Sequence, residues 1–143
     1  MNRTNIKLIP SEATREKIAA LLKKFQIPHD DFCADPHCTI LYSHDVVDVK
    51  ILKLPPLSLP IVGKNAKFEL FDTRYDGVVL VIEFECQSAK ECFRYLKQKY
   101  NFSTRYDEYR AHITMQKNLE GKNLQLPEID FDPMFDKIEM DNG

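Results

Sequence analysis

The sequence predicts a single α+β domain over residues 1–143. Two observations predict one domain with a hydrophobic core: the chain has 143 residues, the usual length of one domain, and 43% of them are hydrophobic. A third observation is the spacing of apolar residues along the chain. Some segments alternate apolar and polar residues, as strands do, while others repeat apolar residues every three to four positions, as helices do. The two kinds of segment mix without strict alternation, which is typical of the α+β class.

The first half of the chain predicts a strand, a helix, a polar loop and a second strand. Their ranges are 6–9, 11–24, 29–36 and 38–43. Ser11 is a suitable N-cap, because its hydroxyl can accept a hydrogen bond from a free N–H of the first turn. Ile18, Leu22 and Phe25 belong to one apolar stripe, and Pro28 prevents the helix from continuing. Residues 46–54 are ambiguous.

The second half of the chain repeats this order after two further strands. The predicted strands cover 57–62, 67–72, 78–86, 111–116 and 135–140. The strand over 78–86 is the strongest, because it is rich in β-branched residues and follows an Asp-Gly turn. Ser88 and Glu91 form a capping box, which predicts a helix over 88–99. A polar loop over 101–110 follows it, and residues 124–132 are irregular.

Two short motifs are the main functional signal. His37-Cys-Thr39-Ile and His112-Ile-Thr114-Met share the pattern His-x-Thr-apolar and lie 75 positions apart. Residues i and i+2 of a strand share a face, so each histidine lies on the same face as its threonine. Each motif follows a predicted helix at a similar distance. Two similar lobes related by an approximate twofold axis would therefore bring the motifs together at their junction.

Paired histidines and threonines suit the cleavage of a phosphodiester bond. A histidine with a pKa near 6.5 can accept a proton or donate one, and both roles are needed. The threonine hydroxyls can donate hydrogen bonds to the non-bridging oxygens, where charge develops. The alternative is that each histidine only satisfies a strand edge. The second copy argues against it, since His29 and His44 lack the pattern.

The paired motifs resemble those of the 2H phosphoesterase superfamily. That resemblance implies a bilobal fold with two antiparallel sheets facing a central cleft and helices outside. It places His37, Thr39, His112 and Thr114 at the catalytic positions. The sequence around both motifs, the compact size and the acidic Glu139 are most similar to bacteriophage anti-CBASS cyclic-oligonucleotide nucleases. These cleave cyclic di- and trinucleotide messengers, such as cyclic GMP-AMP, and so let a phage evade a bacterial immune pathway.

Substrate contacts are predicted from the residues near the motifs. Arg105 and Tyr109 lie in the loop before the second motif, where they could contact phosphate and stack on a base. Tyr75 and Glu139 are further candidates, with ordinary surface roles as the alternative. Some members of the family stack a base on a tryptophan, which this chain lacks. The aromatic residues that could replace it are Phe71, Tyr75, Tyr106 and Tyr109.

Composition limits the class of partner. A net charge of −2 and a pI of about 6.1 argue against a duplex-binding surface and favour a small substrate over long RNA. The sequence contains no apolar signal run and no stretch of about 18 apolar residues, as a membrane span would need. We therefore expect a monomer in the cytoplasm, which is the host bacterial cytoplasm if the protein is viral.

No cofactor is predicted, and a metal site is disfavoured. Possible ligands are dense between His29 and His44, but no paired ligand spacing occurs, and Cys38 faces away from His37. The cysteines, Cys33 among them, include no C-x-x-C pair, and Cys38 and Cys86 lie in apolar strand patterns typical of buried thiols. Two other functions stay open: an RNA-processing enzyme acting on 2′,3′-cyclic or 2′-5′ linkages, and a non-catalytic cyclic-nucleotide sponge.

Overall fold

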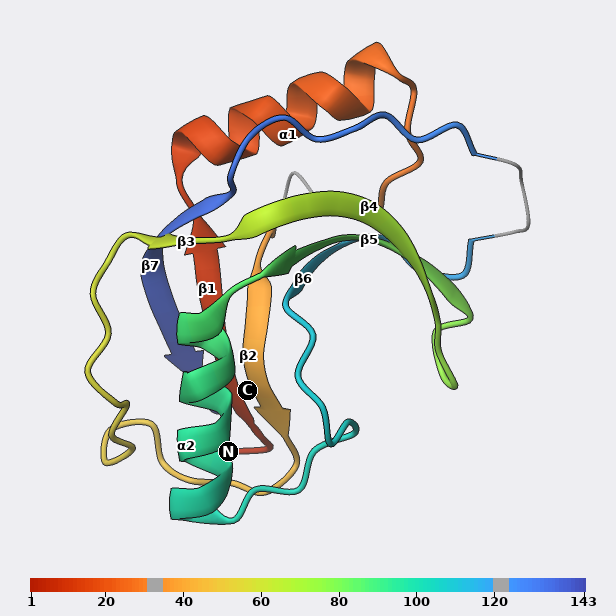
Figure 1. Cartoon of the computed structure of the whole chain (residues 1–143). Helices are drawn as coiled ribbons and strands as arrows, with labels where there is room; N and C mark the ends of the chain where they lie inside the picture. The colour runs from red at the N-terminus through yellow and green to blue at the C-terminus, as the bar shows by residue number, and fades with distance from the viewer. Residues whose placement is uncertain (31–34, 120–123) are drawn as a thin grey trace.

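The computed structural model describes residues 1–30, 35–119 and 124–143. Within them, seven strands form one curled antiparallel sheet in the order β3-β7-β1-β2-β6-β5-β4, and two helices pack on it (Figure 1). The helices are α1 (Glu12–Lys24) and α2 (Gln87–Tyr100). The strands are β1 (Thr4–Pro10), β2 (Cys38–Ser43), β3 (Ile61–Val62), β4 (Lys64–Asp72), β5 (Val78–Glu85), β6 (His112–Gln116) and β7 (Met134–Asp141). The predicted α+β class is confirmed.

The two halves of the chain join into one sheet, whereas two separate sheets were expected. The order is similar on both sides: β1-α1-β2 in the first half and β5-α2-β6 in the second. Strands β2 and β6 are neighbours at the centre, and they join the halves. This join is narrow, because only Cys38 and Ile113 are in register across it.

Helix α1 forms as its sequence predicts. The Ser11 hydroxyl accepts a hydrogen bond from the backbone N–H of Thr14 at 3.2 Å, so the N-cap is confirmed. Ile18 and Leu22 are buried against the sheet. Phe25 was expected in the same stripe, but it is the C-cap residue and remains 45% exposed, because it lies beyond the last helical turn.

Helix α2 begins earlier than predicted. Its N-cap is Cys86, so Ser88 and Glu91 do not form the expected capping box. Strand β5 ends at Glu85 and the buried Cys86 follows it directly, which leaves no room for a separate loop before the helix. Glu91 instead accepts a hydrogen bond from the side-chain amide of Gln87 at 3.1 Å.

The strand predicted over 57–62 is reduced to Ile61–Val62. These two residues pair with Phe135 and Met134 at the start of β7. Pro60 precedes them and has no N–H to donate, so the ladder cannot extend toward the N-terminus.

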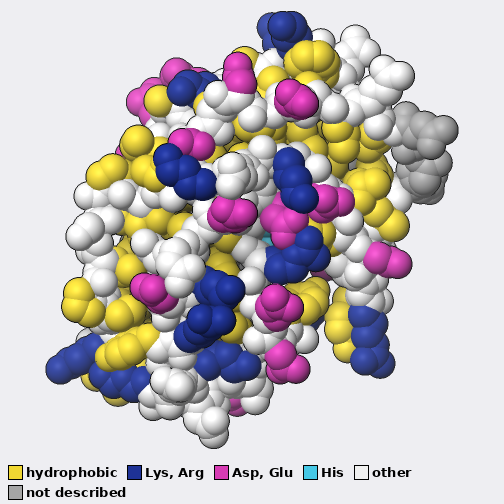
Figure 2. All heavy atoms as spheres, in the orientation of Figure 1, with side chains coloured by type: hydrophobic (Ala, Val, Ile, Leu, Met, Phe, Trp, Pro, Cys, Tyr) yellow, Lys and Arg dark blue, Asp and Glu magenta, His cyan; other side chains and the backbone are white. Residues whose placement is uncertain are grey.

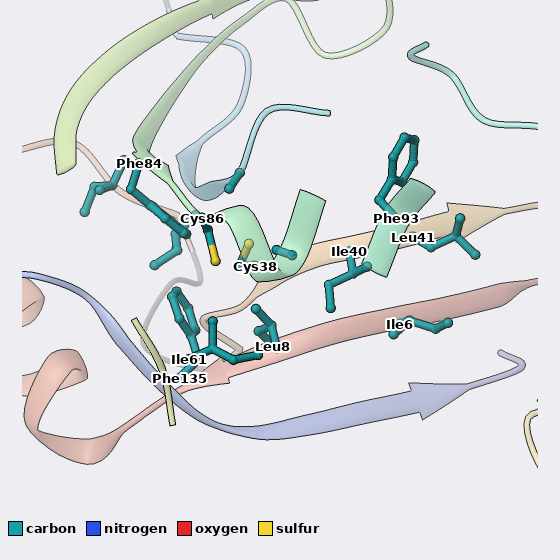
Figure 3. Packing of buried hydrophobic residues seen from close by; sticks show 14 of the residues in the cluster. Ile6, Leu8, Cys38, Ile40, Leu41, Ile61, Phe84, Cys86, Phe93 and Phe135 are labelled. Atoms are coloured by element: carbon teal, nitrogen blue, oxygen red, sulfur yellow. The ribbon is translucent and has the colours of Figure 1, made fainter. Parts of the chain in front are cut away.

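One hydrophobic cluster holds both halves together (Figure 3). It fills the space between the sheet and the helices, and Phe84 of β5 stacks on Phe135 of β7 with ring centroids 5.4 Å apart. Cys38, Cys86 and Cys92 are buried in it, which confirms the prediction for the first two. Cys33 lies outside the described residues.

The opposite face of the sheet carries polar side chains, and we call it the motif face. It is defined by strand alternation and register as the face that holds Lys7, Thr39, Glu83, His112, Thr114 and Glu139. Val81 pairs with Thr114 and is fully buried, yet it lies outside the hydrophobic cluster. Val81 therefore forms part of the apolar floor beneath the motif face.

Candidate functional site

The structure brings the two His-x-Thr motifs together on the central strands. Cys38 and Ile113 are paired and point into the core, so the residues on either side of them face the other way. Extending this antiparallel register by one residue places Thr39 opposite His112 and His37 opposite Thr114. Directly opposed residues have Cβ atoms about 4.5–5.5 Å apart, and diagonal ones about 7–8 Å. The two imidazoles are therefore diagonal neighbours across the join.

Both histidines are held by the same kind of hydrogen bond. Nδ1 of His37 lies 2.9 Å from the backbone carbonyl of Asp35, and Nδ1 of His112 lies 2.7 Å from that of Arg110. A carbonyl oxygen only accepts, so each Nδ1 must carry the hydrogen. In the neutral ring, Nε2 then has a free lone pair, ready to accept a proton. The two motifs thus present the same tautomer.

A chain of contacts surrounds His112. The His112 and Phe71 rings form a T-shaped pair with centroids 5.1 Å apart, and the Arg110 guanidinium lies 4.2 Å from the centre of the Phe71 ring. Arg110 also donates two hydrogen bonds to the Glu83 carboxylate, at 2.6 and 2.9 Å. The backbone and the side chain of Arg110 therefore both help to place His112.

Burial lowers the pKa of His112 below its usual value. The hydrogen bond to the Arg110 carbonyl and the charge of Glu83 oppose this shift, while the charges of Arg110 and His37 reinforce it. The neutral imidazole is therefore favoured near pH 7, and it is the form that accepts a proton.

The other histidine, His37, lies beside a carboxylate. Its side chain is 33% exposed, and the Asp35 carboxylate lies 3.6 Å from Nδ1. The same carboxylate lies 3.5 Å from the Lys7 ammonium. Sequence reasoning missed Lys7 and Glu83 as parts of the site, and it considered Arg110 only as one of the basic residues of the loop before the second motif. Neither position carries a clear signal, because a charged residue at an outward position is the ordinary pattern of a half-exposed strand, and β5 has a second acid, Glu85.

The four predicted substrate contacts are distributed over different places. The Arg105 guanidinium lies 4.7 Å from the centre of the Tyr75 ring, so the turn after β4 and the loop before β6 meet there. Glu139 lies on β7, in register with Lys7, and forms an ion pair with Lys137 at 3.1 Å.

Tyr109 supports the site instead of facing a ligand through its hydroxyl. That hydroxyl donates a hydrogen bond to the backbone carbonyl of Thr39 at 2.7 Å, and the ring packs on Phe93. Burial raises the Tyr109 pKa well above its usual value, so the hydroxyl stays protonated and remains a donor. Tyr109 thereby ties the loop before β6 to strand β2.

The surface around the site has mixed charge. Acidic and basic side chains are interspersed on the face seen in Figure 2 and do not form one large basic area. A cavity of about 530 Å³ lies beside the motif face, lined in part by Glu83, Tyr109 and Arg110. Among the residues that the structure describes, no three His, Cys, Asp or Glu side chains gather as they would around a metal ion.

The fold brings the two His-x-Thr motifs together where β2 and β6 meet, as the resemblance to 2H phosphoesterases implied. The fold is similar to a solved structure described as "Crystal structure of phosphoesterase", with a TM-score of 0.66 and 12% sequence identity. That match covers 98% of this chain and 87% of the other.

The family follows from the sequence. The family model described as "Anti-CBASS protein Acb1" matches residues 4–140, and the chain belongs to this family. The predicted resemblance to anti-CBASS phosphoesterases is therefore confirmed. A search of curated proteins gives no match. In the described part of the chain, neither helix is long and apolar enough to cross a membrane.

Proposed function

We propose that this protein is a metal-independent phosphodiesterase that hydrolyses 3′-5′ bonds of cyclic di- and trinucleotide immune messengers, such as cyclic GMP-AMP. By removing the messenger, it would let a phage evade CBASS defence in the bacterial cytoplasm. Membership of the anti-CBASS family supports the biological role. The observation that carries the chemistry is the pair of histidines, each with Nδ1 bound to a carbonyl and Nε2 free.

The reaction needs one proton acceptor and one proton donor. The ribose 2′-OH gives its proton to one Nε2 and attacks the adjacent phosphorus, forming a new P–O bond. The bond to the 5′-oxygen breaks, and that oxygen takes a proton from the other Nε2. A 2′,3′-cyclic phosphate end and a 5′-OH end result, and water can then open the cyclic phosphate.

His112 is assigned the base and His37 the acid. Burial favours the neutral form of His112, which is the form that accepts a proton. The Asp35 carboxylate near Nδ1 of His37 can interact with the charged form of that ring. Thr39 and Thr114 flank the histidines and would donate hydrogen bonds to the non-bridging oxygens.

Substrate contacts are proposed at two places. Tyr75, held by Arg105, offers an aromatic surface for stacking a base, in place of the tryptophan that the chain lacks. Glu139 lies at the opposite side of the motif face and can accept hydrogen bonds from a base edge. The net charge of −2 favours a small substrate over long RNA.

The test is to incubate the protein with a panel of nucleotides in EDTA and to identify products by mass spectrometry. The panel contains cyclic di- and trinucleotides, 2′,3′-cyclic AMP and 2′-5′ oligoadenylate. Linearisation of the cyclic messengers is expected. Turnover of only 2′,3′-cyclic AMP and 2′-5′ oligoadenylate would indicate an RNA-processing enzyme. Binding of the cyclic messengers without turnover would indicate a sponge.

Alanine variants test the assignment of the histidines. His37→Ala and His112→Ala should each lower kcat by about 10²–10⁴-fold, the usual effect of losing a general acid or base. Binding of the uncleaved messenger should persist. His44→Ala is the control, because His44 lies in an exposed segment outside both motifs. Turnover that survives in the double variant would rule out the catalytic pair.

A further inference from the structure

Lys7 is a largely buried cation at the centre of the motif face. Its register partners are Thr39 on β2 and Glu139 on β7. Its side chain is 13% exposed, whereas those of Arg110 and Lys137 are 54% and 64% exposed. Burial of most of the side chain restricts where the ammonium can lie, and its three N–H donors need acceptors there.

The described partner of Lys7 satisfies this need only in part. The Asp35 carboxylate lies 3.5 Å from the ammonium and is itself 62% exposed to water. A charge-assisted hydrogen bond is normally about 2.7–2.9 Å long. Lys7 therefore has donor capacity left for a further acceptor.

The other cations on this face are matched with acids of the same face. Arg110 pairs with Glu83 at 2.6 Å, Lys137 with Glu139 at 3.1 Å, and Lys67 with Glu69 at 3.5 Å. These pairs cancel much of their own charge. Lys7 differs from these cations in its low exposure, and it neighbours the threonine of the first motif.

We propose that Lys7 binds a non-bridging oxygen of the scissile phosphate. Thr39 is its cross-strand neighbour, so an oxygen near the Thr39 hydroxyl is within reach of a lysine side chain. The positive charge would act where negative charge develops in the transition state. This inference rests on the proposed phosphodiesterase function, and it adds a substrate-binding residue that the His-x-Thr motifs do not contain.

The test compares Lys7→Met and Lys7→Arg with the wild type on cyclic GMP-AMP. Lys7→Met should lower kcat/KM by about 10- to 100-fold, the range for one charged hydrogen bond, and Lys7→Arg should restore part of it. The fold should persist, since the remaining Asp35 carboxylate is exposed to water. Lys23→Met, on an exposed position of α1, controls for the loss of a surface charge.

A second measurement separates phosphate binding from a structural role. The effect of Lys7→Met is measured on the Rp and Sp phosphorothioate forms of the same diester. Sulfur accepts hydrogen bonds weakly, so the loss should shrink for the one form that places sulfur against Lys7. An equal loss on the natural diester and both forms, or a loss below twofold, would overturn the proposal.

Failure of the proposed reaction gives a different result. If the wild type cleaves no member of the nucleotide panel, the phosphodiesterase function is wrong. The Lys7 inference is then decided by calorimetric titration of cyclic GMP-AMP into wild type and Lys7→Met. A Kd weaker by tenfold in the variant supports phosphate binding by Lys7, and absent binding or equal Kd values overturn it.

Discussion

At the scale of single residues, the backbone decides the state of both catalytic candidates. Each imidazole donates Nδ1–H to the carbonyl two residues before it, although the two lie in different halves of the chain. No side chain is needed to fix the tautomer, so substitutions nearby can change the charge around the rings without reversing their roles. The charges around His112 therefore offer a clean test.

Glu83 and Arg110 should move the pH dependence in opposite directions. Glu83 raises the pKa of His112 and Arg110 lowers it, within a net shift that burial makes downward. If His112 is the base, kcat/KM falls once the pH drops below its pKa. The acid limb should move to lower pH in Glu83→Gln and to higher pH in Arg110→Gln, measured from pH 4.5 to 8.

A distant ion pair provides the control for this experiment. Asp132→Asn removes the exposed pair with Lys64, which lies at 2.7 Å, and should leave the acid limb in place. An acid limb that stays fixed in both Glu83→Gln and Arg110→Gln would mean that His112 is not the titrating base.

At the scale of elements, the loop before β6 is braced against β2. Tyr109 donates to the Thr39 carbonyl, and Ser43 donates to the Ser103 carbonyl at 2.6 Å. The Asp45 carboxylate accepts from the Ser103 N–H at 2.6 Å, which lowers the Asp45 pKa. These bonds compensate for the narrow pairing between β2 and β6.

Tyr109→Phe should therefore act on stability more than on substrate binding. It removes the hydrogen bond to the Thr39 carbonyl and the weaker one with the Cys38 thiol, but it keeps the contact with Phe93. Unfolding in urea should therefore become easier by about 0.5–1.5 kcal/mol. KM for the cyclic nucleotide should stay within twofold. Tyr95→Phe, which loses only an exposed contact with Lys99, should change stability by less than about 0.5 kcal/mol. A large rise in KM with unchanged stability would assign Tyr109 to the substrate.

The alternation of apolar and polar residues correctly predicted the strands that have one buried face. The strand over 38–43 is confirmed to the residue, and the strands at 4–10 and 134–141 extend the predicted ranges at both ends. The start of α2 and the length of β3 were wrong, because the packing of Cys86 and the position of β7 decide them. Such long-range effects leave no local pattern in the sequence.

The same distinction applies to the site. The two motifs could be predicted because each contains its own histidine and threonine. Lys7 could not, since a single lysine in a strand has no meaning until register places it beside Thr39. Tyr109 was predicted as a ligand contact. The sequence alone does not show that its hydroxyl donates a hydrogen bond to a backbone carbonyl of β2.

At the scale of the whole molecule, both halves share one core, and its thiols can report on it. Burial raises the pKa of Cys38 to about 12 and that of Cys92 to about 11, and both side chains are fully buried. The thiolate is the reactive form, so these residues should resist iodoacetamide at pH 8 while the protein is folded. Cys86 is 8% exposed and should react first among the three.

The measurement is peptide mass spectrometry after timed labelling, with and without urea. It is made in a Cys33→Ser background, so that the three described cysteines alone report. All three should react fully in urea. Rapid labelling of Cys38 in native buffer would contradict a single closed core, since Cys38 lies at the join between the halves.

The narrow join has a consequence for how the rate can be adjusted. The two imidazoles belong to different half-sheets that share a single pair in register, so neither strand alone fixes the distance between them. That distance depends on the relative orientation of the two half-sheets. The loops and the common core set this orientation. Substitutions in the loops or the core can therefore change the turnover rate without altering the reacting groups. A substrate bound by both halves also raises the free energy of unfolding.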